Sequence, residues 1–167
     1  MKKILLLTWA LIMSVGLFAQ SNDIETLKKW VTDEINNNYA QDAENTVGQK
    51  VKDVKVAFKG NTFVISETNI STDYGVRKYK IVATIPLNKI SEIPLFTDNI
   101  DISDNTNLDI TIMTQGDEDI IEKQTGDDGE TITNNFGNHS VYMKLSYGTE
   151  KVNKIINAIL TIAKASK

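Results

Sequence analysis

The 167-residue chain contains no cysteine. This absence excludes disulfide bridges, zinc–thiolate sites, thiol catalysis and lipid attachment to an N-terminal cysteine. The hydrophobic core alone must therefore stabilise the folded protein.

Histidine is nearly absent, since His139 is the only one. A single histidine without cysteine cannot form a structural zinc site or a two-histidine metal motif. As a general base it would need a nucleophile and an orienting partner, and the adjacent Ser140 is not evidence of such a pair. We expect His139 to lie in a surface loop ahead of the last strand.

The common nucleophile and phosphate-binding motifs are missing too, including G-x-S-x-G, S-x-x-K, G-x-x-x-x-G-K and G-x-G-x-x-G. A hydrolase that uses a carboxylate pair stays open, because two acids suffice for it. Such sites usually have aromatic linings, and beyond residue 20 the only tryptophan is Trp30, which falls on the apolar stripe of a helix. The sequence therefore predicts no catalytic, cofactor-binding or metal-ligating residue and no cofactor.

The N-terminus has the pattern of a secretory signal peptide, residues 1–19. Lys2 and Lys3 precede an almost wholly apolar run of 15 residues, 4–18, and a small residue, Ala19, stands before the expected cleavage site. A membrane-spanning helix needs about 20 apolar residues. We therefore expect export to the periplasm or the exterior, with no stable membrane span after cleavage. Residues 20–167, about 148 in number, are expected to form one domain.

Charge is unevenly distributed along the chain. Removing Lys2 and Lys3 from the 18 basic residues leaves 16 against 22 acidic ones, which gives −6 for residues 20–167. This balance gives no reason to expect nucleic acid as a partner. Eleven acids lie between Asp98 and Glu130 with only Lys123 among them, whereas Lys50 to Lys89 carries eight bases. Such asymmetry can steer a charged ligand, although solvated loops and strand faces also need charge.

Hydrophobic periodicity predicts a helix near each end of this domain. After N-cap candidates at 21–23, Ile24, Leu27, Trp30, Val31 and Ile35 recur at helical spacing, and the pattern stops near the asparagines at 36–38. A second amphipathic helix starts near Thr149 and has a broad apolar stripe, formed by Val152, Ile155, Ile156, Ile159, Leu160 and Ala163.

Between the two predicted helices, period-2 alternation predicts antiparallel strands. Residues 54–65 form a hairpin that turns at Gly60-Asn61, and two strands near 120–123 and 130–133 flank a turn at 125–129. Further strands are expected at 77–85, 108–112 and 141–147. The predicted fold is α+β: a strongly curved antiparallel sheet or partly open barrel of about 6–7 strands, with an N-terminal amphipathic helix and a C-terminal capping helix.

The acidic stretches do not match the spacing of calcium-binding loops. Counting from Asp101, the EF-hand loop needs glycine at its sixth position and glutamate at its twelfth, where this chain has Thr106 and Ile112. Acidic turns at 116–119 and 126–129 lack a ligand spacing, and aspartate and glycine are common in turns. We expect no specific calcium site.

The segment Ile85-Pro86-Leu87-Asn88-Lys89-Ile90, followed by strands with acidic turns and a C-terminal helix, resembles pleckstrin-homology-like barrels. It is also similar to small exported bacterial proteins that share an IPL-x-x-I element. The resemblance covers about residues 54–167 and carries over no functional residue. It implies a binding or interaction module.

The sequence therefore predicts an exported, non-enzymatic binding module whose partner is a small ligand or an envelope protein. The alternative is a carboxylate-dependent hydrolase acting on envelope material. A structural or inhibitor-like protein that uses an exposed strand edge, or the basic face formed by residues 50–89, is a third reading.

Overall fold

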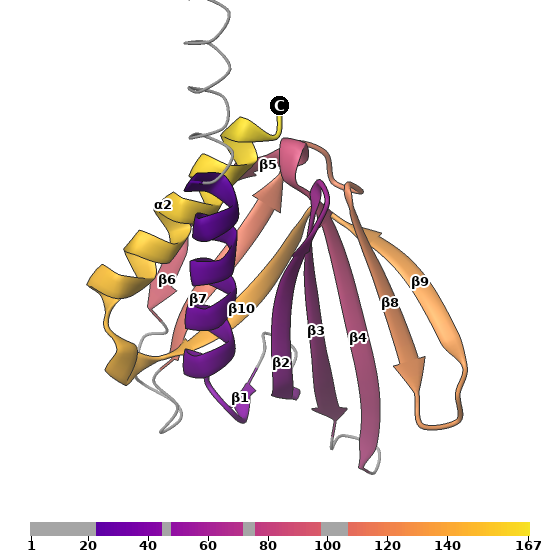
Figure 1. The fold of residues 1–167 in the computed structure, drawn as a ribbon. Coiled ribbons are helices and arrows are strands. Elements are labelled where there is room, and N and C mark those ends of the chain that lie inside the picture. The colour runs from indigo at the N-terminus through magenta and orange to yellow at the C-terminus, as the bar shows by residue number, and fades with distance from the viewer. Residues whose placement is uncertain (1–22, 45–47, 72–75, 98–106) are drawn as a thin grey trace, which may run out of the picture.

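The computed structural model describes residues 23–44, 48–71, 76–97 and 107–167 (Figure 1). The fold is α+β, as the sequence predicts, with antiparallel sheets. Residues 23–38 are helical, and helix α2 spans Thr149–Ala165. Among the described residues, no helix is long and apolar enough to cross a membrane. The predicted signal peptide, residues 1–19, lies outside the described ranges.

The larger sheet has six strands in the order β1-β2-β3-β4-β8-β9. Every neighbouring pair in it is antiparallel. Its strands are β1 (Ala43–Glu44), β2 (Lys50–Lys59), β3 (Thr62–Ser71), β4 (Arg77–Pro86), β8 (Ile120–Gly126) and β9 (Thr131–Phe136).

The second sheet has four strands, in which β7 (Asn107–Thr114) pairs with β10 (Asn138–Lys144), β5 (Ile90–Glu92) and β6 (Leu95–Thr97). Short 3-10 turns, η1 (Leu87–Lys89) and η2 (Leu145–Tyr147), lead out of β4 and into α2. The two sheets do not close into a barrel. The chain leaves β9 at Gly137 and enters β10 in the other sheet.

Strand β2 begins at Lys50, four residues before the alternating pattern starts in the sequence. Val51 and Val54 are both buried although they are three residues apart, which regular alternation does not allow. A register shift between Lys52 and Lys55, with Asp53 at φ 54°, inserts the extra residue that turns both valines inward. The strand therefore contains a β-bulge.

A β-branched residue at the bulge should destabilise the protein. Valine is strongly disfavoured at positive φ, so Asp53→Val should lower the free energy of unfolding by about 1–3 kcal/mol in urea denaturation. Asp53→Asn is the matched control, because asparagine tolerates this conformation, and it should be close to neutral. Equal stability of the two variants would contradict the assigned bulge.

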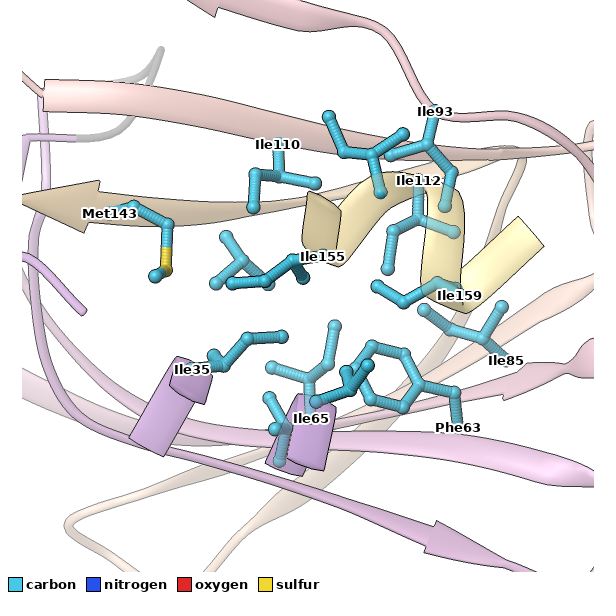
Figure 2. Packing of buried hydrophobic residues seen from close by; sticks show 14 of the residues in the cluster. Ile35, Phe63, Ile65, Ile85, Ile93, Ile110, Ile112, Met143, Ile155 and Ile159 are labelled. Carbon is cyan, nitrogen blue, oxygen red and sulfur yellow. The ribbon is translucent and has the colours of Figure 1, made fainter. Parts of the chain in front are cut away.

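The core lies between the helices and both sheets. Figure 2 shows Phe63 and Ile85 from the larger sheet close to Ile159 of α2, with Ile110 and Ile112 of β7 on another side of the cluster. These five side chains are no more than 1 % exposed. In Figure 1 the helices lie beside β7, β10 and β2, whereas β8 and β9 extend away from them. Part of the larger sheet's inner face is therefore left without a helix over it.

Candidate ligand-binding cleft

The inner face of β3 changes from apolar to polar along the strand. Alternation places Phe63, Ile65, Glu67 and Asn69 on one face, and all four are buried. The first two belong to the hydrophobic core. The last two line a cleft of about 350 Å³. One face of strand β3 therefore contributes first to the hydrophobic core and then to a buried polar site.

The cleft contains side chains of three kinds. Charged or titratable groups come from Glu67, Glu122 and His139. Primary amides come from Gln49, Asn69, Gln124 and Asn138. The remaining lining residues are Ile81, Phe136, Ser140 and Tyr142. Neither lysine nor arginine lines this cleft, so its charge is negative or neutral.

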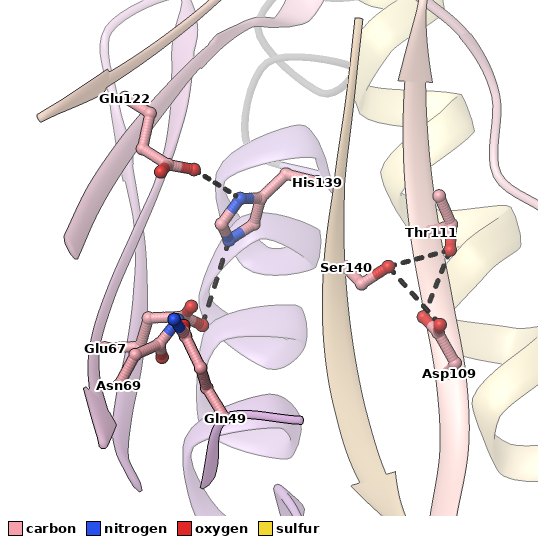
Figure 3. Close-up of polar contacts among 8 residues, drawn as sticks. All are labelled: Gln49, Glu67, Asn69, Asp109, Thr111, Glu122, His139 and Ser140. Atoms are coloured by element: carbon pink, nitrogen blue, oxygen red, sulfur yellow. Dashed lines mark hydrogen bonds and ion pairs between the residues drawn. The ribbon is translucent and has the colours of Figure 1, made fainter. Parts of the chain in front are cut away.

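Strand register brings the two carboxylates onto one face. Glu67 lies opposite Ile81 of β4, and Glu122 of β8 lies opposite Ala83, two residues further along β4. His139 enters from β10 in the other sheet and lies between the two carboxylates (Figure 3). Its Nδ1 is 3.3 Å from Glu122 Oε2, and its Nε2 is 3.8 Å from Glu67 Oε2.

The position of His139 corrects the sequence prediction. It lies on strand β10, not in a loop, and is only 9 % exposed. Alternation along β10 places it on the same face as Val141 and Met143, which belong to the core. The surface-loop expectation is wrong because the two glutamates allow a polar ring to be buried at this point.

The imidazole of His139 is held in its charged form. Burial alone would lower its pKa, but Glu122 and Glu67 act in the opposite direction and raise the pKa to about 9. The two glutamates therefore keep the imidazole ring protonated at neutral pH.

This shift predicts that stability depends on pH. Because the folded pKa of about 9 lies above the ordinary histidine value of 6.5, the stabilisation is fully present below pH 6.5 and is lost as pH rises through 9. The free energy of unfolding should fall by about 3 kcal/mol across this window, measured by guanidinium denaturation from pH 6 to 10. The His139→Gln variant is the reference, and parallel profiles for both proteins would contradict the assignment.

The amides beside the charged trio are only partly satisfied. Asn69 Nδ2 donates to Gln49 Oε1 at 3.5 Å. The buried Oδ1 of Asn69 has no hydrogen-bond partner, and neither does His139 Nε2, whose contact with Glu67 is an ion pair too long for a hydrogen bond. Two buried polar atoms of cleft-lining residues therefore lack a hydrogen-bond partner.

Ser140 does not form a catalytic pair with His139. Its hydroxyl contacts Thr111 Oγ1 at 2.9 Å and donates to Asp109 Oδ2 at 3.3 Å, while Thr111 donates to Asp109 Oδ1 at 3.1 Å. Figure 3 shows Ser140 directed away from His139 toward this network. The Ser140 hydroxyl is therefore bound within the network of Asp109 and Thr111.

Two described acids of residues 98–130 stabilise turns. Asp119 accepts from the Gly116 amide at 2.8 Å, and Asp128 accepts from the Glu130 amide at 3.0 Å. Among the described residues, no group of three or more histidine, aspartate or glutamate side chains is placed to hold a metal ion. The loop at 101–105 that was compared with an EF-hand lies outside the described ranges. Glu122 is the member of the acidic segment that joins the cleft.

Comparisons with known proteins give no help in assigning this site. No protein family, curated protein or solved structure matches the chain. The sequence analysis missed Glu67 and Asn69, yet a signal was present: they continue the inward alternation of Phe63 and Ile65. Polar residues in phase with a buried apolar face mark a buried polar site.

Proposed function

We propose that the protein is an exported, non-enzymatic binding module that holds a small polar ligand in the cleft. The observation that carries this proposal is the buried Oδ1 of Asn69, which has no hydrogen-bond partner and belongs to a residue lining the cleft. An unsatisfied buried acceptor costs about 1–3 kcal/mol. A ligand N–H or O–H at this atom would remove that cost.

The lining favours a neutral or cationic ligand with several donors. Asn69 Oδ1 and the carboxylates of Glu67 and Glu122 are acceptors. The lining contains no lysine or arginine that could attract an anion. Phe136 and Tyr142 offer apolar surface beside these acceptors. Hydroxyl-rich or amine-bearing molecules combine donors with such contact surface.

Three further parts of the proposal rest on the sequence. Residues 1–19 direct the chain to the periplasm or the exterior. A strong curvature of the six-stranded sheet makes its inner face concave and deepens the cleft. A binding role is also what the resemblance to pleckstrin-homology-like proteins implies. An envelope protein is the alternative partner if the cleft holds no small molecule.

Native mass spectrometry of protein purified from its own host tests the proposal. The wild-type protein should carry an additional small-molecule mass, and Asn69→Leu should lose it. Asn153→Leu is the matched control, because Asn153 is exposed on α2, and this variant should keep the ligand. A bare polypeptide mass in every preparation would contradict the small-ligand proposal.

A carboxylate-dependent hydrolase is the second candidate. It requires two acids converging in one concave site, and Glu67 and Glu122 both line the cleft within 3.8 Å of His139. Assays with nitrophenyl glycosides and esters test it. If this candidate is right, Glu67→Gln and Glu122→Gln should each reduce turnover at least about 100-fold. Absence of turnover by the wild-type protein would exclude the hydrolase and favour the binding module.

A further inference from the structure

Strand β9 is an exposed sheet edge that lacks the usual protection. It is the last strand of the six-stranded sheet, and all six of its residues are exposed. Its sequence, TITNNF, contains no charged residue and no proline, and its pairing with β8 runs without a bulge. Natural proteins normally protect such edges with charges, prolines or bulges, because the free backbone groups can pair with another strand.

The other outer strands in the described parts of the chain are shorter or covered. Strand β1 has two residues, and β5 and β6 have three each. The outer side of β10 contacts the segment at Tyr39 and Ala40, where the Ala40 amide donates to Tyr142 O at 2.7 Å. Strand β2 is also unpaired on its outer side beyond Lys50 and Val51, but there the Asn36 side chain bonds the backbone of Val56. Among the described strands, β9 therefore combines length with exposure of all its residues.

The free backbone groups of β9 can be assigned. The Gly126 amide donates to Glu130 O at 3.0 Å, which sets the hydrogen-bonding phase of the β8–β9 ladder. By antiparallel alternation, Ile132, Asn134 and Phe136 direct their backbone groups toward β8. The intervening residues Thr131, Thr133 and Asn135 direct theirs outward, where a new strand would bind.

We propose that β9 pairs antiparallel with the β9 of a second copy of this chain, about a two-fold axis at Asn134. The two six-stranded sheets then become one continuous sheet. Thr133 of each copy exchanges backbone hydrogen bonds with Asn135 of the other. Asn134 faces its own counterpart, in a pair without backbone hydrogen bonds between its members.

The side chains select this register. Ile132 is 58 % exposed and Phe136 is 41 % exposed, although both are apolar. Their partners on β8, Gln124 and Ile120, place both on the inner face of the sheet. With the axis at Asn134, each Ile132 lies opposite Phe136 of the second copy, a pair type that stabilises sheets. With the axis at Thr133, Ile132 would instead lie opposite Asn134.

Charge also favours a second copy as the occupant. Because β9 is uncharged, two copies of it meet without like-charge contact along the strand. The two Glu122 side chains lie across the axis from each other, since Glu122 lies opposite Asn134. They are three strand spacings apart, roughly 14 Å, which is beyond the screening length at physiological salt. Each Glu122 is already paired with His139.

The small size of the contact sets its strength. Stable interfaces bury at least about 1,200 Å² in total, and one six-residue strand pair provides less. We expect association that depends on protein concentration.

Analytical ultracentrifugation measures this association. The mean mass of the wild-type protein should rise toward that of the dimer as the protein concentration increases. Ile132→Lys should weaken association at least about 10-fold while its far-ultraviolet spectrum and unfolding midpoint stay unchanged, because residue 132 is exposed.

Cysteine cross-linking tests the register. Since the chain has no cysteine, a single substitution gives an unambiguous readout. Across the axis, Asn134 faces its counterpart at about 4.5 Å between Cα atoms, within disulfide range. Asn134→Cys should therefore form a covalent dimer under mild oxidation. Thr133→Cys is the matched control, because its counterpart lies about 8 Å away, and it should cross-link much more slowly.

Three results would overturn the proposal. The first is a wild-type protein that stays monomeric at every concentration. The second is equal cross-linking of the Asn134→Cys and Thr133→Cys variants. The third is open-ended growth beyond the dimer, which would show a contact without two-fold symmetry. Loss of dimer formation on Ile132→Lys together with selective cross-linking of Asn134→Cys would establish it.

Discussion

Replacing His139 with alanine should lower the free energy of unfolding by about 3–5 kcal/mol at pH 7. The imidazolium lies between two carboxylates with little exposure, Glu67 at 6 % and Glu122 at 13 % of the side chain. Removing the positive charge leaves two negative charges on one inner face with no cation among the cleft-lining residues. Removing one partner of a buried ion pair is costly because the remaining charge is left uncompensated. Urea denaturation measures the loss, provided that the m-value of the variant equals that of the wild-type protein.

Removing the carboxylates as well should restore much of this stability. A triple variant, His139→Leu with Glu67→Gln and Glu122→Gln, has no buried charge to compensate and should recover at least half of the loss. The exposed pair of Lys154 and Glu150 provides the contrast, since Lys154→Ala should leave stability nearly unchanged. A loss below about 1 kcal/mol for His139→Ala would contradict the electrostatic role assigned to the ring.

The second large effect is expected in the core. Phe63→Ala should lower the free energy of unfolding by about 3–5 kcal/mol, because it removes a large side chain and leaves a cavity. Phe63 is 0 % exposed, and its ring centroid is 4.8 Å from that of Phe58. It also lies near Ile159 of α2 and Ile85 of β4 (Figure 2).

Phe136→Ala is the matched control for this cavity. The residue type and the substitution are the same, but Phe136 is 41 % exposed at the edge strand, so its loss should cost much less. Chemical denaturation of both variants separates burial from residue type. Similar losses for the two phenylalanines would show that the core is not where the structure places it.

The elements that could be predicted from the sequence are those set by local patterns. Alternation at 77–85 matches β4, and the turn at Gly60-Asn61 joins β2 to β3. The apolar stripe beginning at Val152 faces the core from α2. In each case residues close in sequence determine the structure, because helix and strand periods are local properties.

The split into two sheets could not be predicted in the same way. Strand β4 pairs with β8, and the three strands between them in the chain join β10 in another sheet. This choice depends on which strands meet after distant segments have packed. The beginning of β2 was missed for a related reason, since the bulge at Asp53 interrupts the alternation that marks a strand.

The cleft was missed because its members are far apart in the chain. His139, Glu67 and Glu122 come from three strands in two sheets. Without Glu67 and Glu122 a buried histidine would be costly, so a loop was the reasonable expectation for His139. The signal that was available lies on β3, where Glu67 and Asn69 continue an inward-facing apolar pattern.

The charged state of His139 is the most direct test of this description, because the carboxylates, the burial and the cleft all meet at its ring. Since the chain has a single histidine, the imidazole carbon-bound proton resonances can be assigned without ambiguity and followed by NMR from pH 5 to 10.5. We expect a titration midpoint near 9, which should move toward the ordinary value near 6.5 when Glu67 and Glu122 are both replaced by glutamine. A wild-type midpoint at or below 6.5 would contradict it.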